Sequence, residues 1–194
     1  MKIKSAFLLL CAVSLLAGCS KDGTPAGKQN EWLLSATASG VVPKELLQVA
    51  LASEPDYAPY AALMKTNVTF YRVSYLTQYP QGKKITASGI FIIPDDCNAN
   101  YPAVVYTHGS LVKSDAPSRH INTLRSCTFE VLLGAVVCSS FNCAVIMPDY
   151  VGYGDSEAIA HPYIHGESLG QASLDLIEAF REYAASPKAP ISPA

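Results

Sequence analysis

The chain has 194 residues, of which 49% are hydrophobic and 15% are charged. The length suits a single domain with an adequate core. The formal net charge is −2 and the sequence has no basic patch of the kind that phosphate binding requires, so a nucleic-acid partner is excluded.

Residues 1–18 predict a signal peptide of the kind that bacterial lipoproteins carry. Lys2 and Lys4 precede an apolar run over residues 6–17. This run is too short to span a bilayer, which needs about 20 apolar residues, and is typical of an export signal. It ends in Leu-Ala-Gly-Cys19, which resembles the lipobox, in which the cysteine sulfur carries a diacylglycerol. An ordinary secretory peptide is the alternative. We expect an exported protein, anchored through lipid on Cys19 to the bacterial cell envelope, at the outer membrane on its periplasmic or surface face.

The rest of the chain divides into a tether, a domain and a tail. Residues 19–30 are polar and contain glycine and proline, as a flexible tether between lipid and domain would. Residues 31–186 carry the patterns of a folded domain, and residues 187–194 form a proline-rich tail.

Four cysteines fall in the domain, an even number for an oxidising compartment. The sequence is compatible with one or two disulfides and equally with buried free thiols. No Cys-x-x-Cys and no cysteine–histidine cluster has the spacing of zinc ligands, so we predict no metal site. The four are Cys97, Cys127, Cys138 and Cys143.

The first half of the domain predicts helices and then strands. Residues 43–52, with a proline at the first helical position, suit a short helix, and a second short helical piece is expected over 58–65. Residues 68–77 are β-branched and aromatic, which is typical of an exposed-edge strand, and residues 85–93 predict a second strand. Together the two strands form an antiparallel hairpin.

The second half alternates strands and helices. Short apolar strands are expected over 103–106 and 144–147, separated by a helix over 128–138, and a last helix spans 167–185. Strands that are apolar on both faces and separated by a helix are typical of a parallel sheet covered on both sides. We therefore predict an α/β fold with an antiparallel hairpin followed by parallel β-α-β-α. In the last helix we expect Leu169, Ala172, Leu176, Phe180 and Tyr183 to face inward, opposite Gln171, Asp175, Glu178 and Glu182.

The first segment with candidate chemistry follows the strand over 103–106. Acyl-transfer enzymes need N–H donors aimed at the oxyanion of a tetrahedral intermediate. A turn at His108-Gly109 would let the backbone bend so that the amide of Ser110, or of Leu111, becomes one such donor. A plain strand-to-loop turn is the alternative.

The second segment is the loop after the strand over 144–147. Asp149 follows that strand, and we expect its carboxylate to organise the turn rather than to act in catalysis, since short carboxylates often bond nearby amides. Gly152 and Gly154 permit positive φ angles there.

The order of these segments resembles the α/β-hydrolase fold. The string Asp-Tyr-Val-Gly-Tyr-Gly-Asp-Ser over 149–156 lies downstream of a strand that ends in His-Gly-Ser, and the segment after it looks like the secretory-lipase branch. The resemblance covers about residues 66–184. It implies a Ser-Asp-His triad, no cofactor and acyl ester or lipid-like substrates, with the loop around Tyr150 and Tyr153 lining the acyl pocket.

A Gly-x-Ser-x-Gly pattern occurs at 166–170 with Ser168 at its centre. A nucleophile elbow needs an apolar strand directly before it, but the preceding residues contain Pro162 and no such strand. Ser168 is therefore expected to cap the last helix, and a role as nucleophile is the alternative. His161 and His165 stand on either side of Pro162, so we expect them to shape the pocket rim or to cap the helix rather than to bind a metal.

The resemblance places an elbow strand, an acid and a histidine after the last helix, where this sequence has the proline-rich tail. We therefore expect a partial, catalytically incomplete hydrolase of lipase or esterase type, with a sheet edge left open. A peptidase of the same fold remains an alternative, as does a non-enzymatic exported lipoprotein that binds a ligand or partner.

Overall fold

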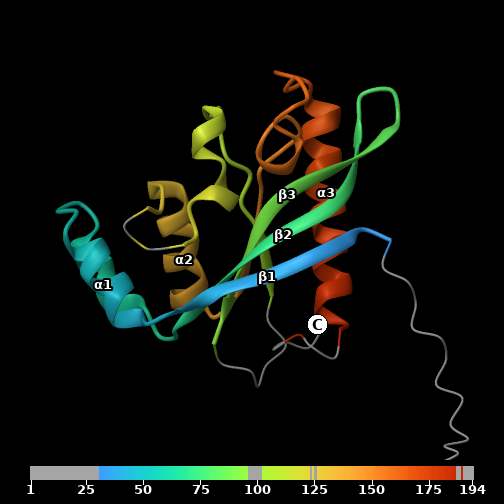
Figure 1. The fold of residues 1–194 in the computed structure, drawn as a ribbon. Helices are drawn as coiled ribbons and strands as arrows, with labels where there is room; N and C mark the ends of the chain where they lie inside the picture. The colour runs from blue at the N-terminus through green and yellow to red at the C-terminus, as the bar shows by residue number, and fades with distance from the viewer. Residues whose placement is uncertain (1–30, 96–101, 123, 125, 187–188, 190–194) are drawn as a thin grey trace, which may run out of the picture.

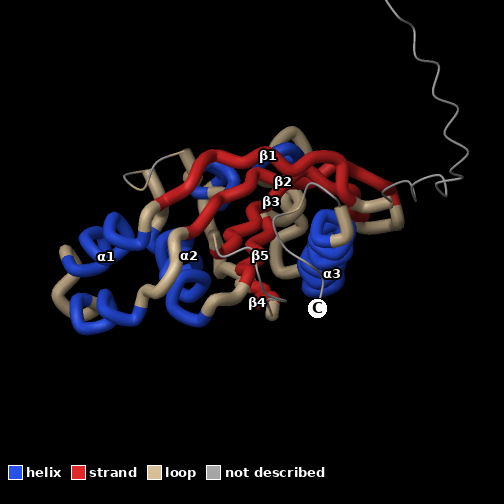
Figure 2. Tube along the Cα trace, turned by 90° about the horizontal axis from the view of Figure 1, so that it is seen from below, coloured by secondary structure: helices blue, strands red, loops and turns tan. Residues whose placement is uncertain are grey.

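A computed structural model describes residues 31–95, 102–122, 124, 126–186 and 189. The signal peptide, Cys19, the tether, Cys97 and nearly all of the tail lie outside these residues. The described chain forms an open sheet of five strands in the order β1-β2-β3-β5-β4, with helices on both faces (Figures 1 and 2). The strands are β1 (Leu33–Val42), β2 (Val68–Tyr79), β3 (Lys83–Pro94), β4 (Ala103–Val105) and β5 (Ala144–Pro148). The helices are α1 (Lys44–Ala52), α2 (Phe129–Phe141) and α3 (Gly166–Ala184), with 3-10 turns η1 (Ala58–Leu63), η2 (Lys113–Asp115), η3 (Pro117–Arg119) and η4 (Gly154–Ser156).

The predicted hairpin and the predicted parallel unit are both present. β2 and β3 pair antiparallel from Val68 opposite Pro94 to Tyr79 opposite Lys83. β4 and β5 pair in parallel through Val104 and Val145, with α2 as the connection between them. β5 runs antiparallel to β3, and β4 and β1 are the two edge strands of the described sheet. The α/β fold class predicted from the sequence is confirmed.

One strand was not predicted, and the expectation that residues 68–77 form an edge strand was wrong. β1 pairs antiparallel with β2, so β2 lies inside the sheet between β1 and β3. β1 consists largely of small residues that are mostly exposed, and its register with β2 shifts twice. Its extended form is fixed by backbone pairing with β2 rather than by an alternating side-chain pattern, which explains why the sequence gives little sign of it.

The sheet separates two apolar layers, and successive residues of β3 alternate between them. Ile90 and Ile92 pack in the layer under α1 and α2, whereas Phe91 packs under α3. Figure 2 shows α2 and α3 on opposite sides of the sheet. The ring of Phe91 meets that of Phe180 edge-on, with centroids 5.0 Å apart. This alternation follows from the two-residue period of a strand.

The inner face of α3 is largely as predicted, but Asp175 is not on its polar face. Its side chain is buried, and its two carboxylate oxygens accept hydrogen bonds from Thr77 Oγ1 and Gln171 Nε2, both at 2.8 Å. A buried carboxylate needs such partners, and Thr77 comes from β2, which a helical pattern does not reveal.

Cys127, Cys138 and Cys143 are not joined to one another by disulfides. Cys138 and Cys143 are buried in the layer under α2. No helix in the described part of the chain is long and apolar enough to cross a membrane.

Candidate active site

The loops after β4 and β5 meet at one edge of the sheet, because parallel strands end on the same side. They enclose a pocket of about 210 Å³. The five residues predicted for the oxyanion and acyl sites all line it, and side chains from the segment before and within α3 complete it. The lining residues are His108, Gly109, Ser110, Tyr150, Tyr153, His161, Tyr163, Ile164 and Leu169.

Three backbone carbonyl groups of the loop after β4 accept hydrogen bonds from side chains. The Tyr150 hydroxyl donates to the His108 carbonyl at 3.5 Å, and the Tyr153 hydroxyl donates to the Leu111 carbonyl at 2.9 Å. His108 Nδ1 donates to the carbonyl of Gly109 at 2.7 Å. Within the described residues, the N–H groups of positions 109–111 have no acceptor. Three carbonyl groups of this loop are therefore engaged by side chains, while its amide donors at 109–111 are left without an acceptor in the described chain.

The aromatic rings of the two loops hold one another in place. The rings of His108 and Tyr150 have centroids 4.5 Å apart, and Tyr153 meets His161 edge-on at 4.7 Å. Burial raises the pKa of both tyrosine hydroxyls, so they stay protonated at neutral pH and act as donors. His161 is itself fixed, since its Nδ1 donates to the carbonyl of Val151 at 2.6 Å. The prediction that His161 shapes the pocket rim agrees with this position.

Asp149 organises the base of the site, as the sequence predicted. Its carboxylate is fully buried and accepts hydrogen bonds from Ser88 Oγ at 2.6 Å and from the Ser118 amide at 2.9 Å. Ser88 Oγ also accepts from the amide of Asp155 at 2.9 Å. Burial raises the pKa of this carboxyl, and the bonds from Ser118 and Ser88 oppose the rise. Asp149 thus joins β3, η3 and η4 beneath the pocket.

The backbone of the loop after β5 depends on left-handed residues. Tyr150 has φ 68°, Gly152 φ 88° and Gly154 φ 51°. Ile164 on the pocket rim has φ 59°, which is strained for a β-branched residue, and its side chain is 81% exposed. Sequence patterns did not indicate that Tyr163, Ile164 and Leu169 would line the pocket, because no regular pattern covers the loop before α3 and a helical pattern does not show which loops the first turn of α3 meets.

Ser168 lies in the first turn of α3 and not at a strand-to-helix elbow, but the expectation that Ser168 itself caps the helix was wrong, because His165 is the N-cap residue. The His165 side chain caps this helix, with Nδ1 accepting from the Ser168 amide at 3.2 Å and lying 3.0 Å from its Oγ. In the described part of the chain, no histidine forms a hydrogen bond or ion pair with a carboxylate. A Ser-His-Asp relay is therefore not assembled by these residues.

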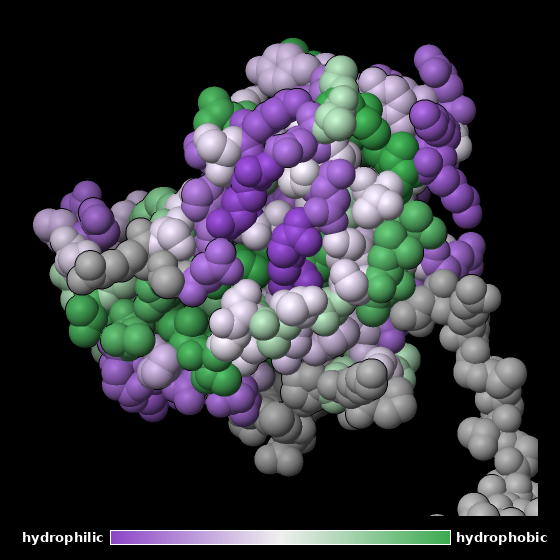
Figure 3. Space-filling model, in the orientation of Figure 1, coloured by the Kyte–Doolittle hydropathy of each residue, from purple (hydrophilic) through white to green (hydrophobic). Residues whose placement is uncertain are grey.

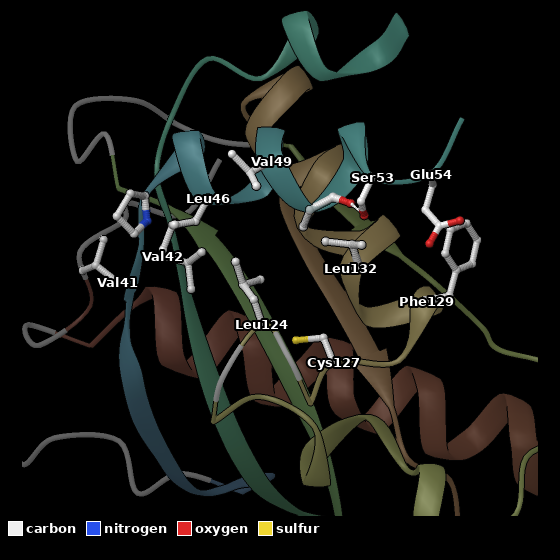
Figure 4. A pocket seen from close by; sticks show the side chains of 12 residues that line it. Val41, Val42, Leu46, Val49, Ser53, Glu54, Leu124, Cys127, Phe129 and Leu132 are labelled. Atoms are coloured by element: carbon white, nitrogen blue, oxygen red, sulfur yellow. Dashed lines mark hydrogen bonds between the residues drawn. The ribbon is translucent and has the colours of Figure 1, made fainter. Parts of the chain in front are cut away.

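A larger cavity of about 790 Å³ lies on the far side of α2, between that helix, α1 and the end of β1 (Figure 4). Its lining is mainly apolar, including Val42, Leu46 and Leu132. Figure 3 shows hydrophobic surface at this α1 end of the molecule. Burial raises the pKa of the Cys127 thiol to about 11, so the sulfur in this cavity is not a thiolate nucleophile at neutral pH.

The described residues contain no cluster of histidine, cysteine, aspartate or glutamate side chains able to hold a metal ion.

Solved structures share this architecture. A protein of Legionella pneumophila assigned as a hydrolase is 30% identical to this chain, with a TM-score of 0.71 over 84% of this chain and 42% of that one. The rice cell wall degrading esterase LipA of Xanthomonas oryzae is 25% identical, with a TM-score of 0.65 over 85% of this chain and 40% of that one. Candida antarctica lipase A is 15% identical, with a TM-score of 0.50 over 80% and 32% of the two chains, which shows a likeness of fold alone.

No family model and no curated protein matches the sequence. The chain spans 42% and 40% of the length of the two bacterial structures. Its mixed sheet, its helices on both faces and these likenesses together establish that it has the α/β-hydrolase-like fold of lipases and esterases.

Proposed function

We propose that this chain carries the oxyanion-binding part of a serine hydrolase of the lipase or carboxylesterase type, which is exported and anchored to the membrane through lipid on Cys19. The observation that supports the hydrolase is the loop after β4. Three of its carbonyl groups accept hydrogen bonds from side chains, and the amides at 109–111 have no acceptor in the described chain.

Such a loop suits the chemistry of ester cleavage. Attack on an acyl carbon places negative charge on the carbonyl oxygen, and N–H donors about 2.7–3.1 Å from that oxygen stabilise it. The Ser110 amide is one such donor in this proposal. The aromatic and apolar side chains around it suit an acyl ester or a lipid-like small molecule, and this chemistry calls for no cofactor.

We further propose that the chain by itself is catalytically incomplete. Ser168 and His165 are engaged with each other as a helix cap, and no carboxylate supports the histidine among the described residues. The same observation favours a second candidate function, that of an exported lipoprotein that binds a ligand without cleaving it.

The two parts of this proposal are tested on the full-length chain with a substrate and a product. Hydrolysis of p-nitrophenyl butyrate is expected not to exceed the blank. Butyrate, whose carboxylate resembles the oxyanion, is expected to shift the amide NMR signals at 109–111 in a saturable way. Turnover that Ser168→Ala abolishes would contradict incompleteness, and unchanged amide signals would overturn the oxyanion assignment. A chain that is inactive but binds an uncharged ligand would support the second candidate.

The lipid anchor is tested separately. Mass spectrometry of the protein recovered from cell envelopes should show a diacylglyceryl group on Cys19, and Cys19→Ser should release the protein from the membrane fraction. An unmodified, soluble wild-type protein would contradict the anchor without affecting the hydrolase assignment.

A further inference from the structure

The hydrogen bond from His108 to the next residue fixes the orientation of one peptide group. A carbonyl oxygen can only accept, so the 2.7 Å contact means that Nδ1 carries the proton and donates it to the Gly109 carbonyl. That carbonyl belongs to the same planar, trans peptide group as the Ser110 amide. Because C=O and N–H point in opposite directions across such a group, a carbonyl turned toward the imidazole turns the Ser110 N–H away from it.

The imidazole is itself held rigidly. Its side chain is only 6% exposed and lies against the rings of Tyr150 and Tyr153, at 4.5 and 6.5 Å between centroids. Its other nitrogen, Nε2, is buried and has no hydrogen-bond partner in the described part of the chain. An apolar ring in this place would avoid that unpartnered nitrogen, so packing alone does not account for a histidine.

We propose that His108 is a positioning residue of the oxyanion site: its Nδ1–H holds the Gly109–Ser110 peptide so that the Ser110 amide faces a ligand oxygen in the pocket. The inference rests on the proposed function. It assigns the histidine a role in aiming a donor, and not in accepting a proton from the substrate.

Two substitutions distinguish a role of His108 in orienting the Ser110 amide from a role in packing against the two tyrosines. His108→Phe keeps a ring between the two tyrosines but removes the Nδ1 donor. His108→Asn places an N–H at the position of Nδ1 but loses most of the ring. If His108 aims the amide, butyrate binding at the Ser110 signal should weaken at least about tenfold in the Phe variant and stay within about threefold in the Asn variant. Thermal stability should follow the opposite order, with the Phe variant close to wild type and the Asn variant less stable.

The alternative outcomes are distinct. Wild-type binding that the Phe variant retains would overturn the positioning role and leave the oxyanion site standing. Wild-type protein that binds no butyrate would overturn the oxyanion assignment. In that case a crystal structure of the Phe variant still tests the geometry, because a Gly109 carbonyl that keeps its direction without the imidazole would overturn the proposed constraint.

Discussion

Gly109 and Gly152 both line or support the candidate pocket, but the backbone requires glycine at only one of them. Gly152 has φ 88°, and a Cβ there would lie 2.5 Å from the Cα of His161. Gly109 has no positive φ, and a Cβ there would meet nothing within 4 Å. The open space beside Gly109 belongs to the pocket, so the small residue leaves room for a ligand rather than for the chain.

This difference predicts opposite results for two alanine substitutions. Gly109→Ala should change the free energy of unfolding by less than about 0.5 kcal/mol, yet weaken butyrate binding about tenfold because its methyl group enters the pocket. Gly152→Ala should lower the free energy of unfolding by about 2 kcal/mol or more through strain and the clash with His161. Urea unfolding and butyrate titration of both variants check this. Equal loss of stability in the two would contradict the assignment of the space beside Gly109.

At the scale of elements, a single side chain of α3 holds the start of β1. The Glu182 carboxylate accepts from the backbone amides of Glu31 at 2.6 Å, Trp32 at 3.1 Å and Leu33 at 2.8 Å. These bonds join residues about 150 positions apart and tie the start of β1 to α3.

Removal of this carboxylate should therefore loosen β1 selectively. Glu182→Ala is expected to lower the free energy of unfolding by about 1–2 kcal/mol, since hydrogen bonds to a charged group are lost, and to speed amide hydrogen exchange at the start of β1. Glu178→Ala is the matched control, because Glu178 forms only a surface pair with Arg181 on the same helix and should cost less than about 0.5 kcal/mol. Equal exchange rates in the two variants would show that α3 does not hold the strand.

For the molecule as a whole, Asp149 makes stability depend on pH. Its folded pKa is raised by burial above the ordinary value of about 3.9, so the folded state binds this proton more tightly than the unfolded chain does. The contribution of Asp149 to stability is therefore full below that ordinary value and is lost as pH rises through the folded pKa. The stability is lost because, above the folded pKa, Asp149 carries a charge in a buried site. The hydrogen bonds from Ser88 and Ser118 reduce the free-energy cost of that charge.

Asp149→Asn removes this titration while it keeps an oxygen able to accept from the Ser118 amide. The stability of the variant should match that of wild type most closely in acid, because the protonated carboxyl and the Asn amide each offer one accepting oxygen, and the variant should become more stable relative to wild type as pH rises above about 4. Urea unfolding of both proteins across this range measures it. A difference that stays constant with pH would mean that Asp149 has the same pKa in the folded and unfolded chain.

Local patterns in the sequence were sufficient for most elements, and together with the family resemblance they indicated part of the pocket. The β2–β3 hairpin, the parallel pair β4 and β5, and the helices between and after them follow from side-chain periods of 2 and 3.6 residues. The chemistry of the turn after the strand over 103–106 and the family resemblance pointed to five residues that line the pocket, namely His108, Gly109, Ser110, Tyr150 and Tyr153. The predicted piece over 58–65 is the 3-10 turn η1, since a short apolar run does not determine the type of helix.

The sequence by itself determined the α/β fold class, the place of the candidate site at the strand ends and the absence of an elbow strand before Ser168, because each depends on residues close together in the chain. Only the tertiary structure decided that β1 pairs with β2 and that Asp175 is buried against Thr77. It also decided that the carbonyl groups after β4 accept hydrogen bonds from His108, Tyr150 and Tyr153. Most of these contacts join residues some 40 to 100 positions apart. Hydrogen bonds and packing between such distant segments depend on how the layers come together, and they leave no periodic trace in the sequence.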